Sequence, residues 1–312
     1  MELSIVIPLF NERGNLVPLH EELKQILADM GTSHEIIFVD DGSTDGSVDE
    51  LHRIKASDPN VRAIRLARNT GQTAALQCGF SNSHGDIVLA LDGDGENDPA
   101  DIPRLVAKLK EGYDLVSGWR TARWQNETLT RRLPSLAANS LISRITGTAL
   151  HDYGCTLKAY RGDLARSLAL YGEMHRFVPA IAAEQGASIA ELEVNFRPRR
   201  SGASKYGPGR IVRTFLDLMT VKFLSGYSTR PIQVFGAIGL LFGILGAMWM
   251  ALLVFEKVFL GYHLADRPAL LLAVLLVVVG VQLVSLGLVG EMIARTYHES
   301  QHKPTYLIKE EF

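Results

Sequence analysis

Asp92 and Asp94 are the residues whose type and spacing most suit metal chemistry. They directly follow the apolar run Asp86–Leu91, with Gly93 between them. Two carboxylates at one strand end can both reach a hard cation, and Mg²⁺ or Mn²⁺ prefers oxygen ligands of this kind. Water and phosphate oxygens would complete the coordination, because Gly93 and Gly95 let the backbone approach a diphosphate. The pattern therefore predicts a site for Mg²⁺ or Mn²⁺ beside a phosphorylated ligand.

A second acidic pair, Asp40 and Asp41, follows the apolar run Glu35–Val39. Carboxylates at a strand end can accept hydrogen bonds from a base or a ribose. The pair can also belong to an ordinary turn before a helix, because Asp45 and Ser47 are favourable N-cap residues. Taken alone, the pair is better explained as such a turn.

The elements that carry these clusters alternate between strand and helix character. Continuous apolar runs predict buried strands, and apolar residues at helical spacing predict amphipathic helices. Alternation of this kind is typical of crossover units on a parallel sheet, and so of an α/β fold. Such sheets bind ligands at the carboxyl ends of their strands, where both acidic clusters fall. The predicted strands are Leu3–Leu9, Glu35–Val39, Val61–Leu66 and Asp86–Leu91, and the predicted helices are Asn15–Met30, Ser47–Lys55 and Gln72–Ser81.

Two long segments without charge, Ile232–Phe255 and Pro268–Gly290, predict membrane-spanning helices. Either segment is about 35 Å long as a helix, whereas the hydrocarbon core of a bilayer is about 30 Å thick. The short connection Glu256–Arg267 makes them a hairpin, so both flanks lie on one side of the membrane. The flanks are richer in Lys and Arg than this connection, which places them in the cytoplasm.

The two acidic clusters together, in this alternation, resemble the family-2 glycosyltransferases of GT-A fold. The segment Ile7–Glu12 is similar to that family's opening nucleotide-binding turn, and Arg68–Gln72 to its diphosphate-side loop. The segment Asp152–Lys158 resembles the D-[FY]-G-C-x-x-[KR] motif of polyprenyl-phosphate glycosyltransferases, among them dolichyl-phosphate mannose synthases and bactoprenol glucosyltransferases. The stretch Phe196–Tyr206 matches their R-x-x-G-x-SKY pattern. The resemblance runs from Leu3 to about Tyr206, and the hairpin extends it to the C-terminus.

This resemblance implies a GT-A (Rossmann-like) domain that transfers a sugar, with inversion, from a nucleotide-diphosphate sugar to a polyprenyl phosphate. Overall likeness to bacterial members favours a UDP-sugar over a GDP-sugar. The implied catalytic residues are Asp94 and Asp152, with Asp92 and Asp94 as metal ligands. The implied nucleotide-sugar site comprises Pro8, Phe10, Asn11, Glu12, Asp40, Asp41, Arg68, Gln72, Asp92 and Gly93.

Basic and hydroxyl side chains are expected to bind the acceptor phosphate. Arginine can grip a phosphate through two donors, and nearby hydroxyls add hydrogen bonds. A basic patch beside a membrane can instead serve only to attract anionic headgroups. The candidates for the acceptor phosphate are Arg120, Arg131, Ser135, Arg200, Ser204 and Lys205.

Asp152 lies on the acceptor side of this resemblance. In many inverting transferases such a residue is a general base. A phosphate monoester has a second pKa of about 6 and is largely ionised at neutral pH, so a strong base is unnecessary here. We therefore expect Asp152 to position groups at the reacting centre, or to help organise the metal or the acceptor. The pair His151-Asp152 also allows a metal-dependent phosphohydrolase, although no His-rich cluster accompanies it.

The predicted organisation has four parts. Residues 1–208 form the cytoplasmic transferase domain, 209–230 an amphipathic helix at the membrane interface, 231–291 the two spans and 292–312 a cytoplasmic tail. The expected location is the inner or plasma membrane, with lipids as partners. A stripe of glycines at three- to four-residue spacing in the first span suits close helix packing, within the hairpin or in a homo-oligomer. These glycines are Gly236, Gly239, Gly243 and Gly246.

Other classes fit the sequence less well. A formal net charge of −2 gives no indication of a nucleic-acid partner. A processive polysaccharide synthase usually carries a Gln-x-x-Arg-Trp motif, which this sequence lacks. A membrane scaffold or lipid-carrier flippase would not require the acidic clusters, and a nucleotidyltransferase for soluble substrates would not require the hairpin. A transferase with a different lipid acceptor stays an alternative.

Overall fold

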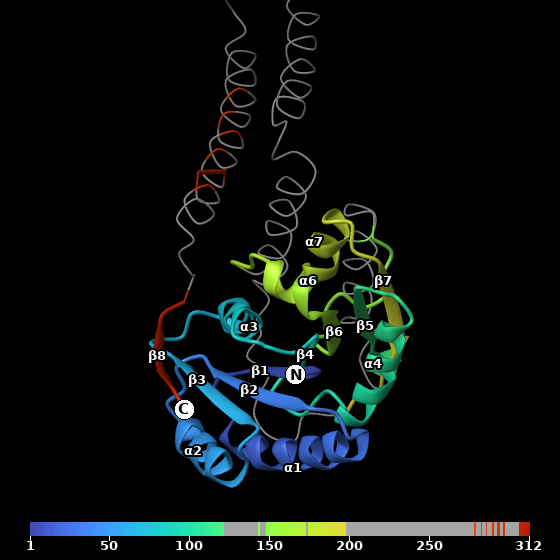
Figure 1. Cartoon of the computed structure of the whole chain (residues 1–312). Coiled ribbons are helices and arrows are strands. Elements are labelled where there is room, and N and C mark those ends of the chain that lie inside the picture. The colour runs from blue at the N-terminus through green and yellow to red at the C-terminus, as the bar shows by residue number, and fades with distance from the viewer. Residues whose placement is uncertain are drawn as a thin grey trace, which may run out of the picture. The chain divides into compact units, whose positions relative to one another are not determined.

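The computed structural model describes residues 1–121, 148–172, 174–197 and 306–312, with Ser143 and a few isolated positions between 278 and 296. Within these residues, eight strands form one sheet in the order β7-β5-β6-β4-β1-β2-β3-β8 (Figure 1). The predicted interfacial helix and both predicted spans lie outside the described residues apart from those isolated positions. No helix in the described part of the chain is long and apolar enough to cross a membrane.

The described elements have the following bounds. The strands are β1 (Leu3–Leu9), β2 (His34–Asp40), β3 (Val61–Leu66), β4 (Ile87–Ala90), β5 (Leu115–Trp119), β6 (Lys158–Arg161), β7 (Ile189–Glu193) and β8 (Ile308–Glu311). The α-helices are α1 (Arg13–Met30), α2 (Ser47–Ser57), α3 (Gln72–Ser81), α4 (Ile102–Lys110), α6 (Gly162–Ser167) and α7 (Val178–Glu184). Two 3₁₀ turns, η1 (Pro99–Asp101) and η3 (Met174–Arg176), complete the set.

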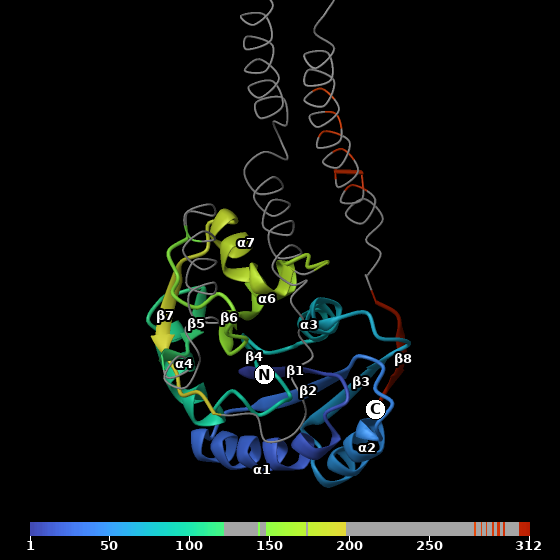
Figure 2. The same cartoon turned by 180° about the vertical axis from the view of Figure 1, so that it is seen from behind.

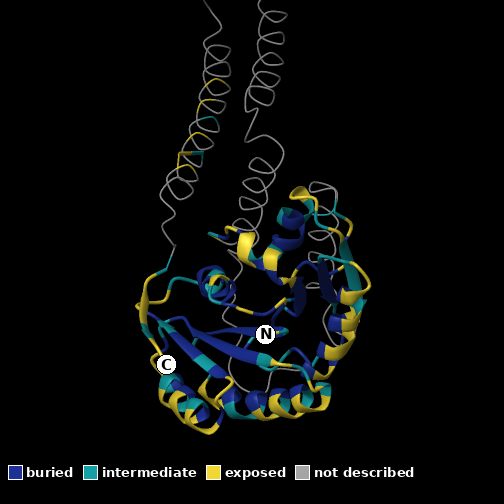
Figure 3. Cartoon of the chain, in the orientation of Figure 1, coloured by how far each residue is buried: buried dark blue, intermediate teal, exposed yellow. Residues whose placement is uncertain are grey.

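Strand β1 lies at the centre of the sheet and is buried on both faces. Side chains alternate along a strand, so residues 3, 5, 7 and 9 of β1 share one face. They join one apolar core with the buried side chains of α1, α2 and α4. On the other face, α3 covers β1 and β2 (Figures 1 and 2). Figure 3 shows the exposed residues of α1 and α2 turned away from the buried strands.

Gly79 sets how closely α3 approaches the sheet. A Cβ atom at this position would lie 2.1 Å from Cγ1 of Val6 on β1. A contact of that length is impossible without movement of the helix or the strand. The absence of a side chain at residue 79 therefore lets α3 lie directly on β1.

The four strands and three helices predicted for residues 3–91 are all present, with ends that differ by no more than two residues. The predicted parallel arrangement is confirmed for β1 to β4, and the whole sheet is mixed, because β6 and β8 run antiparallel to their neighbours. Strand β6 inserts between β4 and β5, and it carries the end of the Asp152–Lys158 segment into the sheet. This insertion brings the predicted acceptor segment beside Asp92 at the end of β4.

Candidate active site

The loops that follow β1 and β2 are tied together by side-chain hydrogen bonds. The Asn11 N–H donates to Ser43 Oγ at 2.8 Å, and the Thr44 N–H donates to Asn11 Oδ1 at 2.8 Å. Asn11 takes a left-handed conformation (φ 54°), which asparagine tolerates better than most residues. The predicted nucleotide-binding turn is thereby held against the Asp40–Thr44 turn.

Asp41 fixes the loop between β3 and α3. Its Oδ1 accepts hydrogen bonds from the N–H and hydroxyl of Thr70 at 2.7 and 2.9 Å, and its Oδ2 accepts one from the Gly71 N–H at 2.8 Å. Gly42 permits this contact, because a Cβ there would lie 2.8 Å from the backbone of Arg68 and Asn69. Both carboxylate oxygens of Asp41 are therefore engaged in shaping the loop that begins α3.

Asp40 is fully buried at the end of β2. The Ser43 N–H donates to its two oxygens at 3.1 and 3.2 Å, and Arg65 Nε lies 3.6 Å from Oδ2. Burial raises the pKa of the Asp40 carboxyl, while the bonds from Ser43 and the charge of Arg65 oppose that rise. The two oxygens of Asp40 therefore share one main-chain donor, whereas Asp41 accepts from three donors.

The carboxylate of Asp92 joins three parts of the site. Gln72 Nε2, at the start of α3, donates to Oδ1 at 2.7 Å, and Thr156 Oγ1 donates to Oδ2 at 2.6 Å. Thr156 belongs to the predicted acceptor segment, and Asn97 Nδ2 donates to its hydroxyl at 3.2 Å. Asp92 therefore connects the donor-side loop to the acceptor segment through two neutral donors.

The charges around Asp92 fit a bound cation. Burial, and then the charge of Asp94, raise the pKa of the Asp92 carboxyl to about 7. Asp94 is itself buried, and Glu96 adds a further negative charge to which Asp92 responds. No group of three or more His, Cys, Asp or Glu side chains suited to a metal occurs among the described residues. A divalent cation here would thus need oxygens from a ligand or water besides Asp92 and Asp94.

Arg120 and Asp152 form a buried ion pair. Arg120 Nε donates to Asp152 Oδ2 at 2.8 Å and Nη2 donates to Oδ1 at 3.1 Å, which is a bidentate geometry. Burial alone would lower the pKa of Arg120, but the charge of Asp152 and its hydrogen bonds raise it above the ordinary value. Asp152 also accepts from the Gly154 N–H. A carboxylate with both oxygens so engaged is poorly suited to be a general base.

Glu191 of β7 holds the turn that carries Asp152. Its Oε1 accepts from the N–H groups of His151 and Asp152 at 2.8 and 3.2 Å, and its Oε2 lies 2.8 Å from His151 Nδ1. The His151 ring stacks on Trp119, with centroids 4.2 Å apart. These contacts explain the His151-Asp152 pair as part of a positioned turn. Glu191 belongs to no sequence motif, so residue type and spacing did not identify it.

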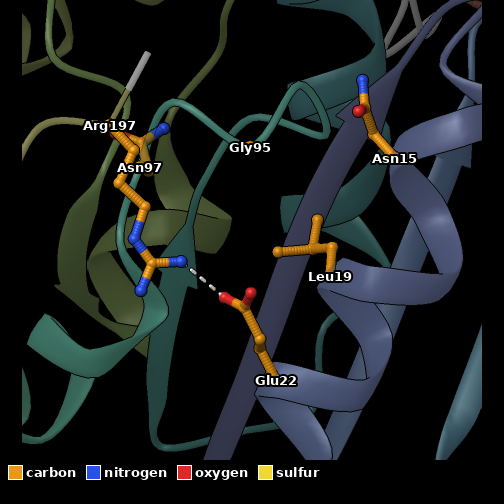
Figure 4. A pocket seen from close by; sticks show the side chains of 6 residues that line it. All are labelled: Asn15, Leu19, Glu22, Gly95, Asn97 and Arg197. Atoms are coloured by element: carbon orange, nitrogen blue, oxygen red, sulfur yellow. Dashed lines mark hydrogen bonds and ion pairs between the residues drawn. The ribbon is translucent and has the colours of Figure 1, made fainter. Parts of the chain in front are cut away.

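The stretch Phe196–Tyr206, which carries predicted acceptor residues, begins beside the loop Asp92–Glu96. Phe196 pairs with Asn97 in an isolated antiparallel bridge, and the Arg197 N–H donates to Glu96 O at 3.0 Å. A pocket at this point is lined by residues of α1, of the loop after Asp94 and by Arg197 (Figure 4). Arg197 spans it to reach Glu22 at 2.7 Å. The first residues of the stretch Phe196–Tyr206 therefore contact the Asp92–Glu96 loop.

The structure brings together the predicted residues on the donor side. Two of them, Phe10 and Glu12, are half-buried on the loop after β1. Gln72 is half-buried at the start of α3, and Arg68 is exposed on the loop between β3 and α3. Pro8 lies within β1, paired with Val39 of β2. Gly93 packs closely on the end of β1, since a Cβ there would lie 3.2 Å from Leu9 Cβ. Five predicted acceptor residues fall in ranges that the structure does not describe, among them Arg131 and Ser135 in 122–142 and Ser204 and Lys205 in 198–277.

Arg200 falls in the second of those ranges as well. Arg120 is therefore the one predicted acceptor residue whose surroundings the structure describes. Its guanidinium is committed to Asp152 by two hydrogen bonds. The roles assigned to all of these site residues stay predictions.

Solved structures of similar fold place the chain in the GT-A class. Mannosyl-3-phosphoglycerate synthase from Rubrobacter xylanophilus gives a TM-score of 0.58 at 15% identity, covering 72% of this chain and 74% of that one. Glucosyl-3-phosphoglycerate synthase from Mycobacterium tuberculosis, solved with Mn²⁺, UDP and glucosyl-3-phosphoglycerate, gives 0.55 at 21% identity, covering 72% and 79%. At these identities the likeness concerns the fold alone.

The sequence identifies the family. Residues 4–168 match the profile of glycosyl transferase family 2, and the chain belongs to that family. The dodecaprenyl-phosphate galacturonate synthase of Rhizobium johnstonii is 40% identical, over 100% of this chain and 93% of the relative. The undecaprenyl-phosphate 4-deoxy-4-formamido-L-arabinose transferase of Pseudomonas syringae is 37% identical, over 98% and 90%. The predicted family and enzyme class, a glycosyltransferase, are confirmed.

The Arg120–Asp152 pair gives a testable prediction. Asp152→Ala should lower the free energy of unfolding by about 3 kcal/mol, because it leaves a buried guanidinium without its partner. Replacing both residues, as Arg120→Met with Asp152→Leu, should restore most of that stability yet leave sugar transfer lost. Chemical denaturation and a transfer assay measure the two effects separately.

The matched control is Arg53→Ala, which removes an exposed arginine paired with Glu50. It should change stability by no more than about 0.5 kcal/mol. A double variant that transfers sugar as well as the wild type would contradict a positioning role for the buried pair.

Proposed function

We propose that this chain transfers a sugar from a nucleotide-diphosphate sugar to a polyprenyl phosphate, with inversion, at the cytoplasmic face of a membrane. The observation that carries this proposal is the position of Asp92. Its carboxylate contacts Gln72 on the donor side and Thr156 in the acceptor segment, so both substrates would meet at one end of the sheet. The relatives named for a galacturonate and a formamido-arabinose on polyprenyl phosphates support the acceptor class.

The donor nucleotide would lie across the carboxyl ends of β1, β2 and β4. This is where the strand order of the sheet reverses, because β2 and β4 flank β1 on opposite sides. Asp40 would accept hydrogen bonds from the nucleoside, and the turn at Phe10–Glu12 would enclose it. Arg68 is exposed on the neighbouring loop and would contact the base or diphosphate. Asp41 contributes by fixing that loop, as its bonds to Thr70 and Gly71 show.

Asp94 and Asp92 would hold Mg²⁺ or Mn²⁺. The fit rests on an excess of buried negative charge, since the charge of Asp94 raises the pKa of Asp92. When bound, the cation would neutralise the charge that develops on the departing nucleotide diphosphate. Gln72 and Thr156 would orient the Asp92 carboxylate toward the cation through the hydrogen bonds that they donate to its two oxygens.

On the acceptor side, a phosphate oxygen of the lipid would attack the anomeric carbon as the bond from that carbon to the diphosphate oxygen breaks. The products are a sugar joined to the polyprenyl phosphate and a free nucleoside diphosphate. No proton need be removed, because the phosphate monoester is largely ionised near neutral pH. Asp152 would hold Arg120 in place, and Arg120 would supply positive charge at the reacting centre together with Arg131, Ser135, Arg200, Ser204 and Lys205.

The membrane arrangement belongs to the same proposal. Residues 1–208 would form the catalytic domain, with an interfacial helix at 209–230, two spans within 231–291 and a tail from 292 to 312 on the cytoplasmic side. Holding the catalytic domain at the interface would let the polyprenyl chain stay in lipid while its phosphate enters the site. A UDP-sugar is the favoured donor, and a homo-oligomer is a further proposal from the glycine stripe of the first span.

Transfer can be tested directly. Full-length protein in detergent is incubated with undecaprenyl phosphate, Mn²⁺ or Mg²⁺, and a panel of UDP- and GDP-sugars that includes galacturonate and 4-deoxy-4-formamido-L-arabinose. Mass spectrometry should detect a polyprenyl-phosphate sugar. Asp94→Asn should reduce its formation by about 100-fold or more, because a ligand to the cation is lost.

The isosteric control Glu193→Gln, at an exposed carboxylate of β7, should leave transfer unchanged. Release of the nucleotide without a lipid product would indicate a different acceptor. Absence of both from a folded protein would contradict the proposal.

Binding of the cation should depend on pH. Asp92 must lose its proton to bind a metal, and its pKa is about 7 in the protein without a cation. The affinity for Mn²⁺ should therefore rise with pH through about 7, by about tenfold per unit below that value, and binding should release a proton at pH 6. Calorimetry in two buffers of different ionisation enthalpy counts the protons. Equal affinity at pH 6 and pH 8, with no proton released, would contradict this expectation, and Asp92→Asn should abolish the dependence.

A further inference from the structure

The C-terminal strand β8 lies along β3 at the edge of the sheet (Figures 1 and 2). Ala63 and Phe312 exchange two main-chain hydrogen bonds of 2.8 and 2.9 Å, and the Ala67 N–H donates to Leu307 O at 2.8 Å. The ring of Phe312 stacks on His52 of α2, with centroids 3.7 Å apart. The strand is thus fixed to β3 on both sides of Arg65, and it belongs to the same compact unit as the donor site.

Arg65 has an acidic partner on each neighbouring strand. Its Nε lies 3.6 Å from Asp40 Oδ2 on β2, and its Nη1 donates to Glu310 Oε1 on β8 at 3.2 Å. The strand registers place Arg65 directly opposite both residues. The Asp40 side chain is fully buried, whereas 40% of the Glu310 side chain is exposed. Arg65 therefore links the sheet edge to the end of β2 where Asp40 lies.

The contact between Arg65 and Asp40 supplies charge without occupying the carboxylate. The Nε–H of Arg65 is buried and makes no hydrogen bond within the described part of the chain, since 3.6 Å is too long for one. At that distance the electrostatic attraction between the two groups is still substantial, because Asp40 is shielded from water. The charge of Arg65 favours the ionised form of Asp40, against the rise in pKa that burial causes. Arg65 thus opposes protonation of Asp40 through its charge, while its Nε–H forms no hydrogen bond to the Asp40 oxygens.

We propose that Arg65 is a positioning residue for nucleotide recognition, and that Glu310 of the C-terminal strand holds it against Asp40. Strand β8 is then part of the donor site, although none of its residues contacts the nucleotide. The proposal rests on the assignment of Asp40 to the nucleoside. Its consequence is that a change in the last residues of the chain alters the affinity for the donor.

The neighbouring pair Arg62–Glu311 provides a matched control. Arg62 Nη2 donates to Glu311 Oε1 at 2.6 Å, so it binds the same strand with the same chemistry. Its second acidic partner is Glu35, at the opposite end of β2 from Asp40. Loss of Glu311 should therefore weaken docking of the strand without removing the charge beside Asp40.

The test compares Arg65→Gln, Arg65→Lys, Glu310→Gln, Glu311→Gln and Asp40→Asn in the full-length protein. The KM for the nucleotide sugar, kcat, and the Kd for UDP with Mn²⁺ are measured, with GDP in parallel and thermal unfolding as a check on folding. Arg65→Gln should raise KM and Kd by about tenfold or more, as expected when a buried carboxylate loses its partner, with kcat within about twofold. Arg65→Lys should recover part of the loss. Glu310→Gln should raise both by about threefold, the effect of a partly exposed ion pair, and Glu311→Gln should not.

The outcomes separate this inference from the assignment on which it rests. If Asp40→Asn weakens nucleotide binding while Arg65→Gln and Glu310→Gln do not, Asp40 keeps its role and the inference is overturned. If Asp40→Asn binds UDP and GDP like the wild type, the assignment fails and the inference fails with it. Equal effects of Glu310→Gln and Glu311→Gln on Kd would show that the strand acts on stability alone, which also overturns the inference. Should Arg65→Gln not fold, Glu310→Gln decides, because its side chain lies at the exposed edge of the sheet.

Discussion

The hydrogen-bonded carboxylate of Asp92 is the group on which the geometry of this site depends. Each of its two oxygens accepts one hydrogen bond, from Gln72 at the start of α3 and from Thr156 in the acceptor segment. Neither donor carries a charge, so neither neutralises the negative charge that ionised Asp92 offers to a cation. Because α3 lies directly on β1 at Gly79, the position of Gln72 is set by the packing of the core. The local order of the site is therefore a consequence of helix-to-sheet packing.

A chain of similar contacts runs along the carboxyl ends of the strands. Asn11 joins the first loop to the second, Asp41 joins the second to the third, and Asp92 joins the third to the fourth and to the acceptor segment. Arg120 and Asp152 then fix the far side of the site as a buried ion pair. Three further carboxylates, Asp40, Asp92 and Asp94, lie at or just after the carboxyl ends of β2 and β4. The same contacts that shape the loops therefore also place the negative charges of the site.

Much of the fold could be predicted from the sequence wherever a strand is an uninterrupted run of apolar residues. Strands β1, β2 and β4 are apolar runs buried along almost their whole length, which is why their limits were predictable. Strand β8 has the sequence Ile-Lys-Glu-Glu, with no apolar period, and it exists because β3 offers it an edge. Strand β6 begins with the buried Lys158, whose ammonium donates to the Cys155 carbonyl and whose pKa burial lowers. The strands with which β6 and β8 pair lie far away in sequence, so these pairings leave no local signal.

The site also contains residues that the sequence motifs revealed and residues that only the tertiary contacts revealed. Motif resemblance singled out Asp40, Asp92, Asp94 and Asp152 and assigned the nucleoside contact to Asp40, but it did not reveal the structural role of the neighbouring Asp41. That role depends on the bonds from Thr70 and Gly71 to Asp41. Glu191, Arg65 and Thr156 act through tertiary contacts, so residue type alone did not single them out.

If Gln72 and Thr156 act on transfer through the one carboxylate of Asp92, their effects must be coupled. A double-mutant cycle of Gln72→Ala and Thr156→Val, measured on kcat/KM for the nucleotide sugar, tests this coupling. We expect the two losses to be strongly non-additive, since either variant already frees Asp92 from its fixed orientation, and we expect Thr156→Ser to retain most activity. Losses that simply add would show that the two side chains act independently and that Asp92 does not couple them.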